Sequence, residues 1–209
     1  MLDNSSLTQN KIYTSVAERI RNGTYKPGEK LSENNLAKEF KCSRTPVREA
    51  VKKLEQNGLV IIQPKSGTYI RQYTKDEIIN ALEIRAYLEA CAFRLDIEKN
   101  VDLTPLKNCL KEMDKIAKQE PFDIEKFGNL HFDFHKSLVS LSGNTFLQNI
   151  YNDLHLIALY GVFFNPMDKN DLLITQEEHK KILKLIEDKD QEGQDFIIQH
   201  LLRRRNDFK

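Results

Sequence analysis

The sequence predicts a mainly α-helical protein, with a compact N-terminal domain followed by an all-α bundle of six helices. Apolar residues recur at helical spacing through most of the chain. Two short β-prone runs, Leu59 to Ile62 and Thr68 to Ile70, flank the turn Lys65-Ser66-Gly67 and predict a small β-hairpin. Beyond the hairpin the helical pattern continues without a strand signal. We therefore expect one domain at residues 1–73 and a second at residues 74–209.

The composition is that of a globular protein, with 40% hydrophobic and 30% charged residues. No apolar run reaches the roughly 18 residues that a membrane span needs, and the start MLDNSSLTQNK lacks the apolar segment of a secretory signal. The three cysteines, Cys42, Cys91 and Cys109, have no CxxC spacing and are typical of reduced thiols. These features predict a cytoplasmic protein that does not associate with a membrane.

The net charge of +1 conceals an asymmetry along the chain. Residues 1–71 hold 13 Lys and Arg against 7 Asp and Glu, a net charge of +6, and the remainder holds 19 against 24, a net charge of −5. A basic N-terminal third indicates that this part alone faces a polyanion such as nucleic acid.

Three helices are expected before the hairpin. The first runs from about Leu7 to Asn22, and the second follows the N-cap residue Ser32. The third begins after Ser43, with Pro46 in its first turn, where a missing N–H breaks no hydrogen bond. The apolar positions that should form the core are Ile12, Val16, Ile20, Leu36, Ala37, Phe40, Val47, Ala50, Val51 and Leu54.

The second and third helices, joined by a tight turn at Lys41-Cys42, form a helix-turn-helix, and the hairpin behind them is its wing. In such a unit the first residues of the second helix reach base edges in DNA. Arg44, Thr45 and Arg48 occupy that place, and an arginine bound to guanine discriminates by about 1–3 kcal/mol. Both arginines could instead be solvated surface residues. The helix spacing, the wing and the local charge together favour DNA binding.

Residues 11–71 resemble the winged helix of the GntR family of bacterial transcription regulators. The resemblance is carried by Pro27-Gly28-Glu29-Lys30-Leu31-Ser32-Glu33, Ser43-Arg44-Thr45-Pro46-Val47-Arg48-Glu49-Ala50 and Lys65-Ser66-Gly67-Thr68. Lys41-Cys42 departs from the glycine and apolar residue usual in the family. The DNA-contacting residues predicted from the helix-turn-helix and this resemblance are Asn34, Asn35, Ser43, Arg44, Thr45, Pro46, Arg48, Lys65, Ser66 and Gly67.

Six helices are expected in the second domain. Their ranges are Asp76–Glu98, Thr104 to about Lys118, Asp123–Leu141, Asn144 to a point before Pro166, Asp171–Lys189 and Asp190–Phe208. All five histidines of the chain lie here: His131, His135, His155, His179 and His200. His131 and His135 are four residues apart on one helix face, a spacing that suits two ligands of one metal ion. Taken singly, a histidine is more often an ordinary core or surface residue than a metal ligand.

The second domain resembles the FCD effector domain of the FadR-like branch of that family. The matching segments are Glu83 to Glu89, Phe134 to Leu138, Ser142 to Asn144, Glu178-His179 and His200-Leu201. The resemblance implies four metal ligands, His131, His135, His179 and His200, and imidazole donors favour Zn²⁺ or Ni²⁺ over Mg²⁺. His131 stands where the family usually has aspartate, so Asp133 is an alternative ligand, although it points roughly 160° away from His135 on a helix.

Arg85 stands where that branch has an arginine facing the effector cavity, and a guanidinium near a metal suits a carboxylate effector. Its alternative role is an ion pair with Glu89, four residues on. His155 falls outside the metal pattern and is a second candidate for lining the cavity.

The function predicted is that of a homodimeric transcription regulator, which binds double-stranded operator DNA and responds to a small molecule. Because a guanidinium such as that of Arg85 suits a carboxylate, we expect this effector to be a carboxylate. Two alternatives use the same histidines: a sensor for which the metal itself is the signal, and a metal-dependent hydrolase. The hydrolase is disfavoured because no HExxH motif, phosphate loop or nucleophile motif is present. We therefore expect a regulator and not an enzyme.

Overall fold

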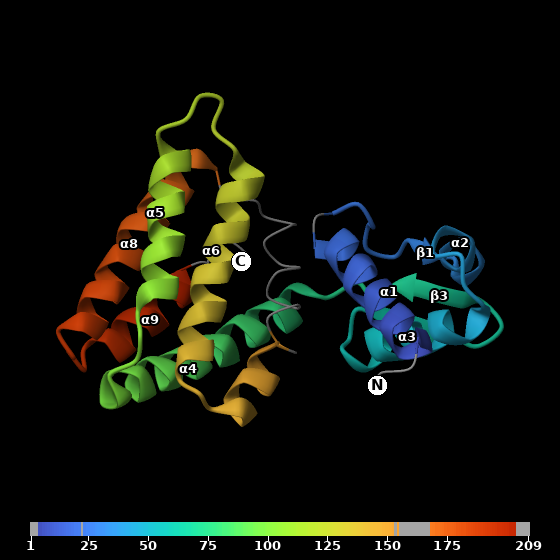
Figure 1. The fold of residues 1–209 in the computed structure, drawn as a ribbon, viewed down its shortest axis with the longest axis horizontal. Coiled ribbons are helices and arrows are strands. Elements are labelled where there is room, and N and C mark those ends of the chain that lie inside the picture. Colours follow the sequence, from blue (N-terminus) through green and yellow to red (C-terminus); the bar gives the residue numbers. More distant parts are fainter. Residues whose placement is uncertain (1–3, 22, 153, 155–167, 204–209) are drawn as a thin grey trace. The chain divides into compact units, whose positions relative to one another are not determined.

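The computed structural model describes residues 4–21, 23–152, 154 and 168–203 (Figure 1). Contacts divide the chain into two compact units, one up to Thr74 and one from Lys75 onward. The mainly α-helical class with a small sheet near the N-terminus is confirmed. Among the described residues, no helix has the length and apolar character that crossing a membrane requires.

The first unit is built on three helices: α1 (Asn4–Arg21), α2 (Glu33–Glu39) and α3 (Arg44–Gln56). The Oγ of Ser32 accepts a hydrogen bond from the N–H of Asn35 and caps α2, as the sequence predicts. The apolar faces of α1 and α3 pack together because both helices repeat apolar residues at helical spacing. The buried core of the unit includes Ile12, Val16, Ile20, Leu36, Val47, Ala50, Val51 and Leu54.

The predicted hairpin is present as β2 (Val60–Gln63) and β3 (Gly67–Ile70), which pair antiparallel with Val60 opposite Ile70. A third strand, β1 (Lys30–Leu31), pairs with the other edge of β3 and gives the order β1-β3-β2. The sequence did not predict β1, because two residues are too few to show the alternation that marks a strand. This pairing attaches the segment that precedes α2 to the wing.

The turn of the wing needs backbone conformations that few residues adopt. Lys65 has a φ of 65° and Gly67 a φ of 130°, and a side chain at Gly67 would also press on Lys30. The carbonyl of Gln63 accepts from the N–H of Ser66 and closes the turn at 3.1 Å. The tip of the wing is therefore a defined turn, and the side chains of Lys65 and Ser66 are exposed on it.

The second unit is wholly helical among its described residues (Figure 1). Its helices are α4 (Lys75–Lys99), α5 (Thr104–Ala117), α6 (Ile124–Leu141), α8 (Lys169–Glu187) and α9 (Gly193–Leu202), and residues 145–152 are also helical. The long helix α4 packs against α6, α8 and α9, and α5 packs against α6 and α8. The core between them contains Phe93, Leu106, Met113, Phe127, Phe134, Leu138, Ile182 and Ile197.

Several helix boundaries differ from the predicted ones. Helix α8 begins two residues earlier than expected, because the carboxylate of Asp168 accepts from the N–H of Asp171 and caps it. Helix α9 begins at Gly193 instead of Asp190, after a turn in which Lys189 has a positive φ of 54°. Residues 204–208, the expected end of this helix, lie outside the described part of the chain. Helix α5 begins at Thr104, as expected, and the N–H and hydroxyl of Thr104 both donate to the carboxylate of Asp102.

We expect Gly193→Ala to destabilise the second unit, because α9 approaches α4 closely at this glycine. A Cβ on Gly193 would lie 2.0 Å from the ring of Phe93, which is fully buried. The ring cannot move aside in a packed core, and overpacking typically costs about 1–3 kcal/mol or more. A lower urea midpoint with an unchanged slope would show this. Gly128→Ala on α6 is the matched control, since nothing lies within 4 Å of its added methyl group.

Candidate DNA-binding surface and metal centre

The predicted DNA-contacting residues occupy the exposed side of the first unit. Asn34 and Asn35 lie in the first turn of α2, and Arg44, Thr45 and Arg48 lie in the first turns of α3. All five side chains are exposed. Pro46 is buried, so its role is to pack against the core and to start the helix. The surface therefore presents polar and cationic groups at the N-terminal end of a helix, while the apolar groups of the same turn face inward.

The N-terminus of α3 lacks a side-chain cap. Ser43 occupies the N-cap position, as predicted, but its side chain makes no capping hydrogen bond. The first N–H groups of a helix need acceptors, and the positive end of the helix dipole favours an anion there. Arg48 is held loosely, with its Nε 3.6 Å from Glu33 of α2. Backbone and side chains at this end thus suit a phosphate and a base edge.

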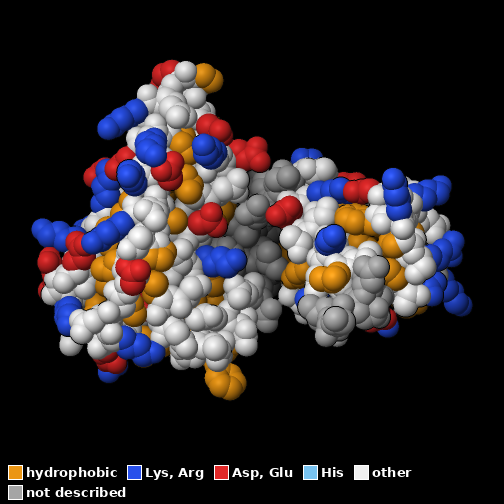
Figure 2. Space-filling model, viewed as in Figure 1, with side chains coloured by type: hydrophobic (Ala, Val, Ile, Leu, Met, Phe, Trp, Pro, Cys, Tyr) orange, Lys and Arg blue, Asp and Glu red, His pale blue; other side chains and the backbone are white. Residues whose placement is uncertain are grey.

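Cationic side chains dominate the first unit. In Figure 2, Lys and Arg gather along one edge of this unit, whereas acidic and basic side chains alternate over the helical unit. This agrees with the net charge of +6 for residues 1–71. Such a field attracts the phosphate backbone of DNA and makes affinity dependent on salt.

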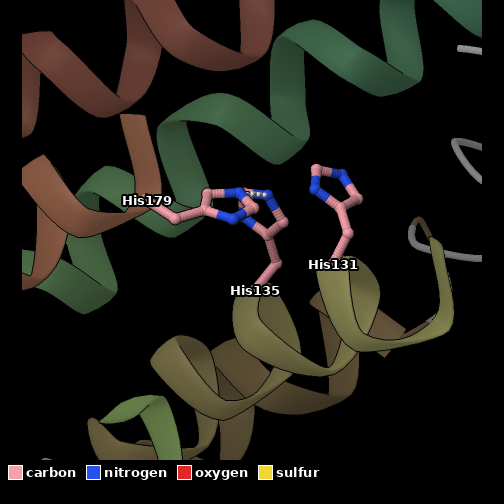
Figure 3. A group of neighbouring side chains, drawn as sticks. All are labelled: His131, His135 and His179. Atoms are coloured by element: carbon pink, nitrogen blue, oxygen red, sulfur yellow. Dashed lines mark hydrogen bonds between the residues drawn. The ribbon is translucent and has the colours of Figure 1, made fainter. Parts of the chain in front are cut away.

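Four histidines meet inside the helical unit. His131 and His135 come from α6, His179 from α8 and His200 from α9. The side chains of His131, His135 and His179 point toward one another (Figure 3), and each offers a nitrogen within 4.8 Å of the others. His135 and His179 are fully buried, and His131 and His200 are less than 10% exposed.

Three Nε2 atoms converge at the centre of this group. The Nε2 of His135 lies 3.1 Å from that of His179 and 3.4 Å from that of His200. Because Zn–N bonds are about 2.0–2.1 Å long, two nitrogens on one ion lie about 3.0–3.4 Å apart. The ring of His131 completes the group, stacked on that of His179 at a centroid distance of 4.9 Å.

Two carboxylates lie behind this centre. The Oε2 of Glu89, on α4, lies 2.6 Å from the Nδ1 of His135, and the Oε2 of Glu178, on α8, lies 2.7 Å from the Nδ1 of His200. The Nδ1 of His179 is buried and has no hydrogen-bond partner among the described residues. The sequence predicted neither carboxylate contact, since each joins residues on different helices.

Glu89 also joins α4 to the helical residues 145–152. Its Oε1 accepts from the Nε of Arg85 at 2.7 Å and from the hydroxyl of Tyr151 at 3.0 Å. All three side chains are buried. The expected ion pair between Arg85 and Glu89 is thus present, and the Nη2 of Arg85 remains buried without a hydrogen-bond partner in the described part of the chain.

The electrostatics keep the carboxylate of Glu89 ionised and the imidazoles of His135 and His179 neutral. Burial would raise the pKa of Glu89, but His135 and Arg85 outweigh it and hold that pKa below its usual range. Burial lowers the pKa of His135 to about 4 in spite of Glu89. Burial, reinforced by the neighbouring imidazoles, also puts the pKa of His179 well below its ordinary value. Neutral imidazoles are the form in which histidine binds metal ions.

These residues fit a divalent transition metal. The donors are buried imidazole nitrogens, which suit Zn²⁺ and Ni²⁺, and those of His131, His135 and His179 lie within 4.8 Å of one another. Asp133 does not belong to the group, because its side chain is exposed on the opposite side of α6. Its exposure argues against the alternative in which it replaces His131. His155 lies outside the described residues.

Asp96 is a buried carboxyl that the sequence did not single out. It is 1% exposed on α4, and neither oxygen has a hydrogen-bond partner among the described residues. Burial raises the pKa of Asp96 to about 8, so the group is protonated at neutral pH. Asp96 lies seven residues after Glu89, on the same face of α4. This position is the one signal in the sequence that could have marked Asp96 as buried.

A basic winged helix-turn-helix joined to a helical domain with a buried polar centre defines a ligand-responsive DNA-binding regulator. Comparison with known families agrees. Residues 8–70 match the family described as "Bacterial regulatory proteins, gntR family", and residues 80–204 match the FCD domain. The chain belongs to the GntR family and carries an FCD effector domain. It is a DNA-binding transcription regulator with a ligand-binding domain.

Known regulators resemble the chain over most of its length. It is 31% identical to the HTH-type transcriptional regulator YdhC of Bacillus subtilis (strain 168), over 92% of this chain and 85% of that protein. It is 29% identical to the Nta operon transcriptional regulator of Aminobacter aminovorans, over 85% and 83%. Since these families and relatives are regulators, the chain is not an enzyme, and the hydrolase alternative is set aside.

Solved structures share the fold. The structure of E. coli McbR/YncC superposes with a TM-score of 0.81 at 21% identity, covering 100% of this chain and 98% of that one. A GntR transcriptional regulator from Rhodococcus sp. RHA1 gives 0.78 at 20% identity, with 96% of each chain covered. At this identity the likeness establishes the arrangement of elements and not the ligand.

Proposed function

We propose that this regulator binds a divalent transition metal, Zn²⁺ or Ni²⁺, through His131, His135, His179 and His200, and that a carboxylate effector binds beside it. The observation that carries the proposal is the convergence of three buried Nε2 atoms at 3.1 and 3.4 Å. When bound, such an ion supplies a Lewis-acidic site for an anionic oxygen ligand. The residues hold that site inside the helical unit and exclude water from it.

Arg85 supports the carboxylate part of the proposal. Its side chain is buried, its Nε pairs with Glu89, and its Nη2 has no hydrogen-bond partner among the described residues. A guanidinium holds carboxylates well because it offers parallel N–H donors. An effector that accepts from Nη2 would bind next to the Glu89–His135 pair and therefore close to the metal ligands.

The output of the proposed site is a change in DNA binding. We propose that Asn34, Asn35, Ser43, Arg44, Thr45, Arg48, Lys65, Ser66 and Gly67 contact operator DNA, and that two copies of the chain read two half-sites. A dimer is supported by the single α3 of each chain, which can occupy only one major-groove segment. The effector would alter affinity by a coupling free energy, typically about 1–3 kcal/mol.

The test uses full-length protein and a DNA fragment selected from a random pool for tight binding. Its affinity is measured by fluorescence anisotropy, with metal-loaded and metal-depleted protein, against a series of small mono- and dicarboxylates. We expect at least one carboxylate to shift the affinity by about 5-fold or more, and only in metal-loaded protein. A shift caused by the metal alone would favour a metal sensor. Absence of any shift would contradict a regulatory role for the site.

Arg85→Lys keeps the charge but loses the planar pair of donors, so it should weaken the response to the carboxylate. Arg94→Lys is the matched control, because Arg94 lies on the same helix and also pairs with a glutamate four residues on, but in solvent. An equal response in wild type and Arg85→Lys would remove Arg85 from the effector site.

A further inference from the structure

Glu89 and Glu178 lie immediately behind two of the proposed metal ligands, and neither is itself a ligand. The geometry assigns both as positioning residues: each accepts the Nδ1–H of a histidine and thereby leaves that histidine's Nε2 lone pair facing the centre. The inference rests on the proposed metal site, and it explains why two imidazoles from two helices, those of His135 and His200, present the same nitrogen.

The pair formed by Glu89 and His135 is fixed from several sides. Both side chains are 0% exposed and their nearest atoms are 2.6 Å apart. Arg85 and Tyr151 donate to the other carboxylate oxygen, so Glu89 cannot rotate without losing buried hydrogen bonds. An ionised carboxylate can only accept. The neutral ring of His135 must therefore carry its proton on Nδ1.

The pair formed by Glu178 and His200 is held in the same way at its partly exposed edge. Its nearest atoms are 2.7 Å apart. The Nη2 of Arg203 lies 3.2 Å from the same oxygen of Glu178 and donates to Thr175 at 3.0 Å. Glu178 and Thr175 belong to α8, whereas His200 belongs to α9. The pair thus fixes both the tautomer of His200 and the position of α9 against α8.

His179 provides an internal contrast. Its Nδ1 has no acceptor among the described residues, and its Nε2 lies 3.1 Å from the Nε2 of His135. If His135 presents a lone pair there, metal-free His179 must carry its proton on Nε2 and donate it to His135. The inference therefore predicts two Nδ1–H rings, those of His135 and His200, and one Nε2–H ring, that of His179.

The first experiment measures the tautomers in metal-free, full-length protein by long-range ¹H–¹⁵N NMR of the imidazoles, assigned with single histidine variants. We expect the Nδ1–H form for His135 and His200 and the Nε2–H form for His179. An Nε2–H form at His135 or His200 would overturn the inference. This result does not depend on metal binding, so it remains decisive if wild type binds no metal and the proposed function fails.

The second experiment measures affinity for Zn²⁺ or Ni²⁺ alone, in competition with a chromophoric chelator. We expect Glu178→Ala to weaken binding by about 10–100-fold, as loss of such a partner typically does. Glu178→Gln keeps an acceptor oxygen and should recover part of that loss. Glu177→Ala is the control, since Glu177 is the neighbouring residue on α8 and its exposed side chain pairs with Lys180, away from the histidines. Equal affinity of Glu178→Ala and wild type would overturn the role of Glu178.

Discussion

His135→Ala is expected to abolish the stabilisation of the helical unit by metal. His135 lies at the centre of the group, in contact with both His179 and His200. A ligand at 1,000 times its dissociation constant stabilises the folded state by about 4 kcal/mol, which raises the melting temperature by roughly 10 °C. Thermal unfolding of wild type with and without Zn²⁺ or Ni²⁺ should show that rise, and His135→Ala should show none.

Lys136→Ala is the matched control for this substitution. Lys136 follows His135 on α6, and its side chain is exposed. The control should therefore keep the full rise in melting temperature. A metal-dependent rise in His135→Ala equal to that of wild type would mean that the ion binds elsewhere on the protein.

Arg44→Ala is expected to weaken binding to the selected DNA by about 5–150-fold, the range that corresponds to the loss of 1–3 kcal/mol from a bidentate contact with guanine. Binding to random DNA should fall much less, because it depends on total charge. Arg44 is exposed in the first turn of α3, so the substitution removes no core contact. Parallel anisotropy titrations on selected and random DNA measure both effects.

Lys52→Ala separates base reading from charge. Lys52 lies on the same helix, two turns later, and its side chain is 62% exposed beside Glu49. The substitution Lys52→Ala removes the same formal charge as Arg44→Ala. It should therefore weaken binding to selected and random DNA by the same factor. Equal losses on the two DNAs for Arg44→Ala would contradict a base-reading role for this arginine.

Local sequence signals were enough to predict most of the fold. The helix-turn-helix and the wing each have apolar periodicity and turn residues within their own segment. The features that were missed depend on distant residues. Strand β1 exists because β3 supplies its hydrogen-bond partners, and the start of α9 can lie close to Phe93 because Gly193 has no side chain.

The site was also predicted only in part, because some of its contacts join residues that are distant in the sequence. The four proposed metal ligands were expected from the spacing of His131 and His135 and from a family resemblance. The structure groups His131, His135 and His179 and places His200 beside His135. The contacts from Glu89 to His135 and Tyr151 join three separate helices, so no spacing in the sequence could reveal them. The burial of His131 and the exposure of Asp133 favour His131 as the ligand, as the helical angle between Asp133 and His135 also does.

The metal content of the purified full-length protein tests the central claim most directly. Elemental analysis is done on wild type and His135→Ala after reconstitution with Zn²⁺ and Ni²⁺ and removal of free metal. The convergence of three buried Nε2 atoms predicts a stoichiometric divalent ion in wild type and none in the variant. A wild-type protein that remains free of metal would contradict the proposed centre.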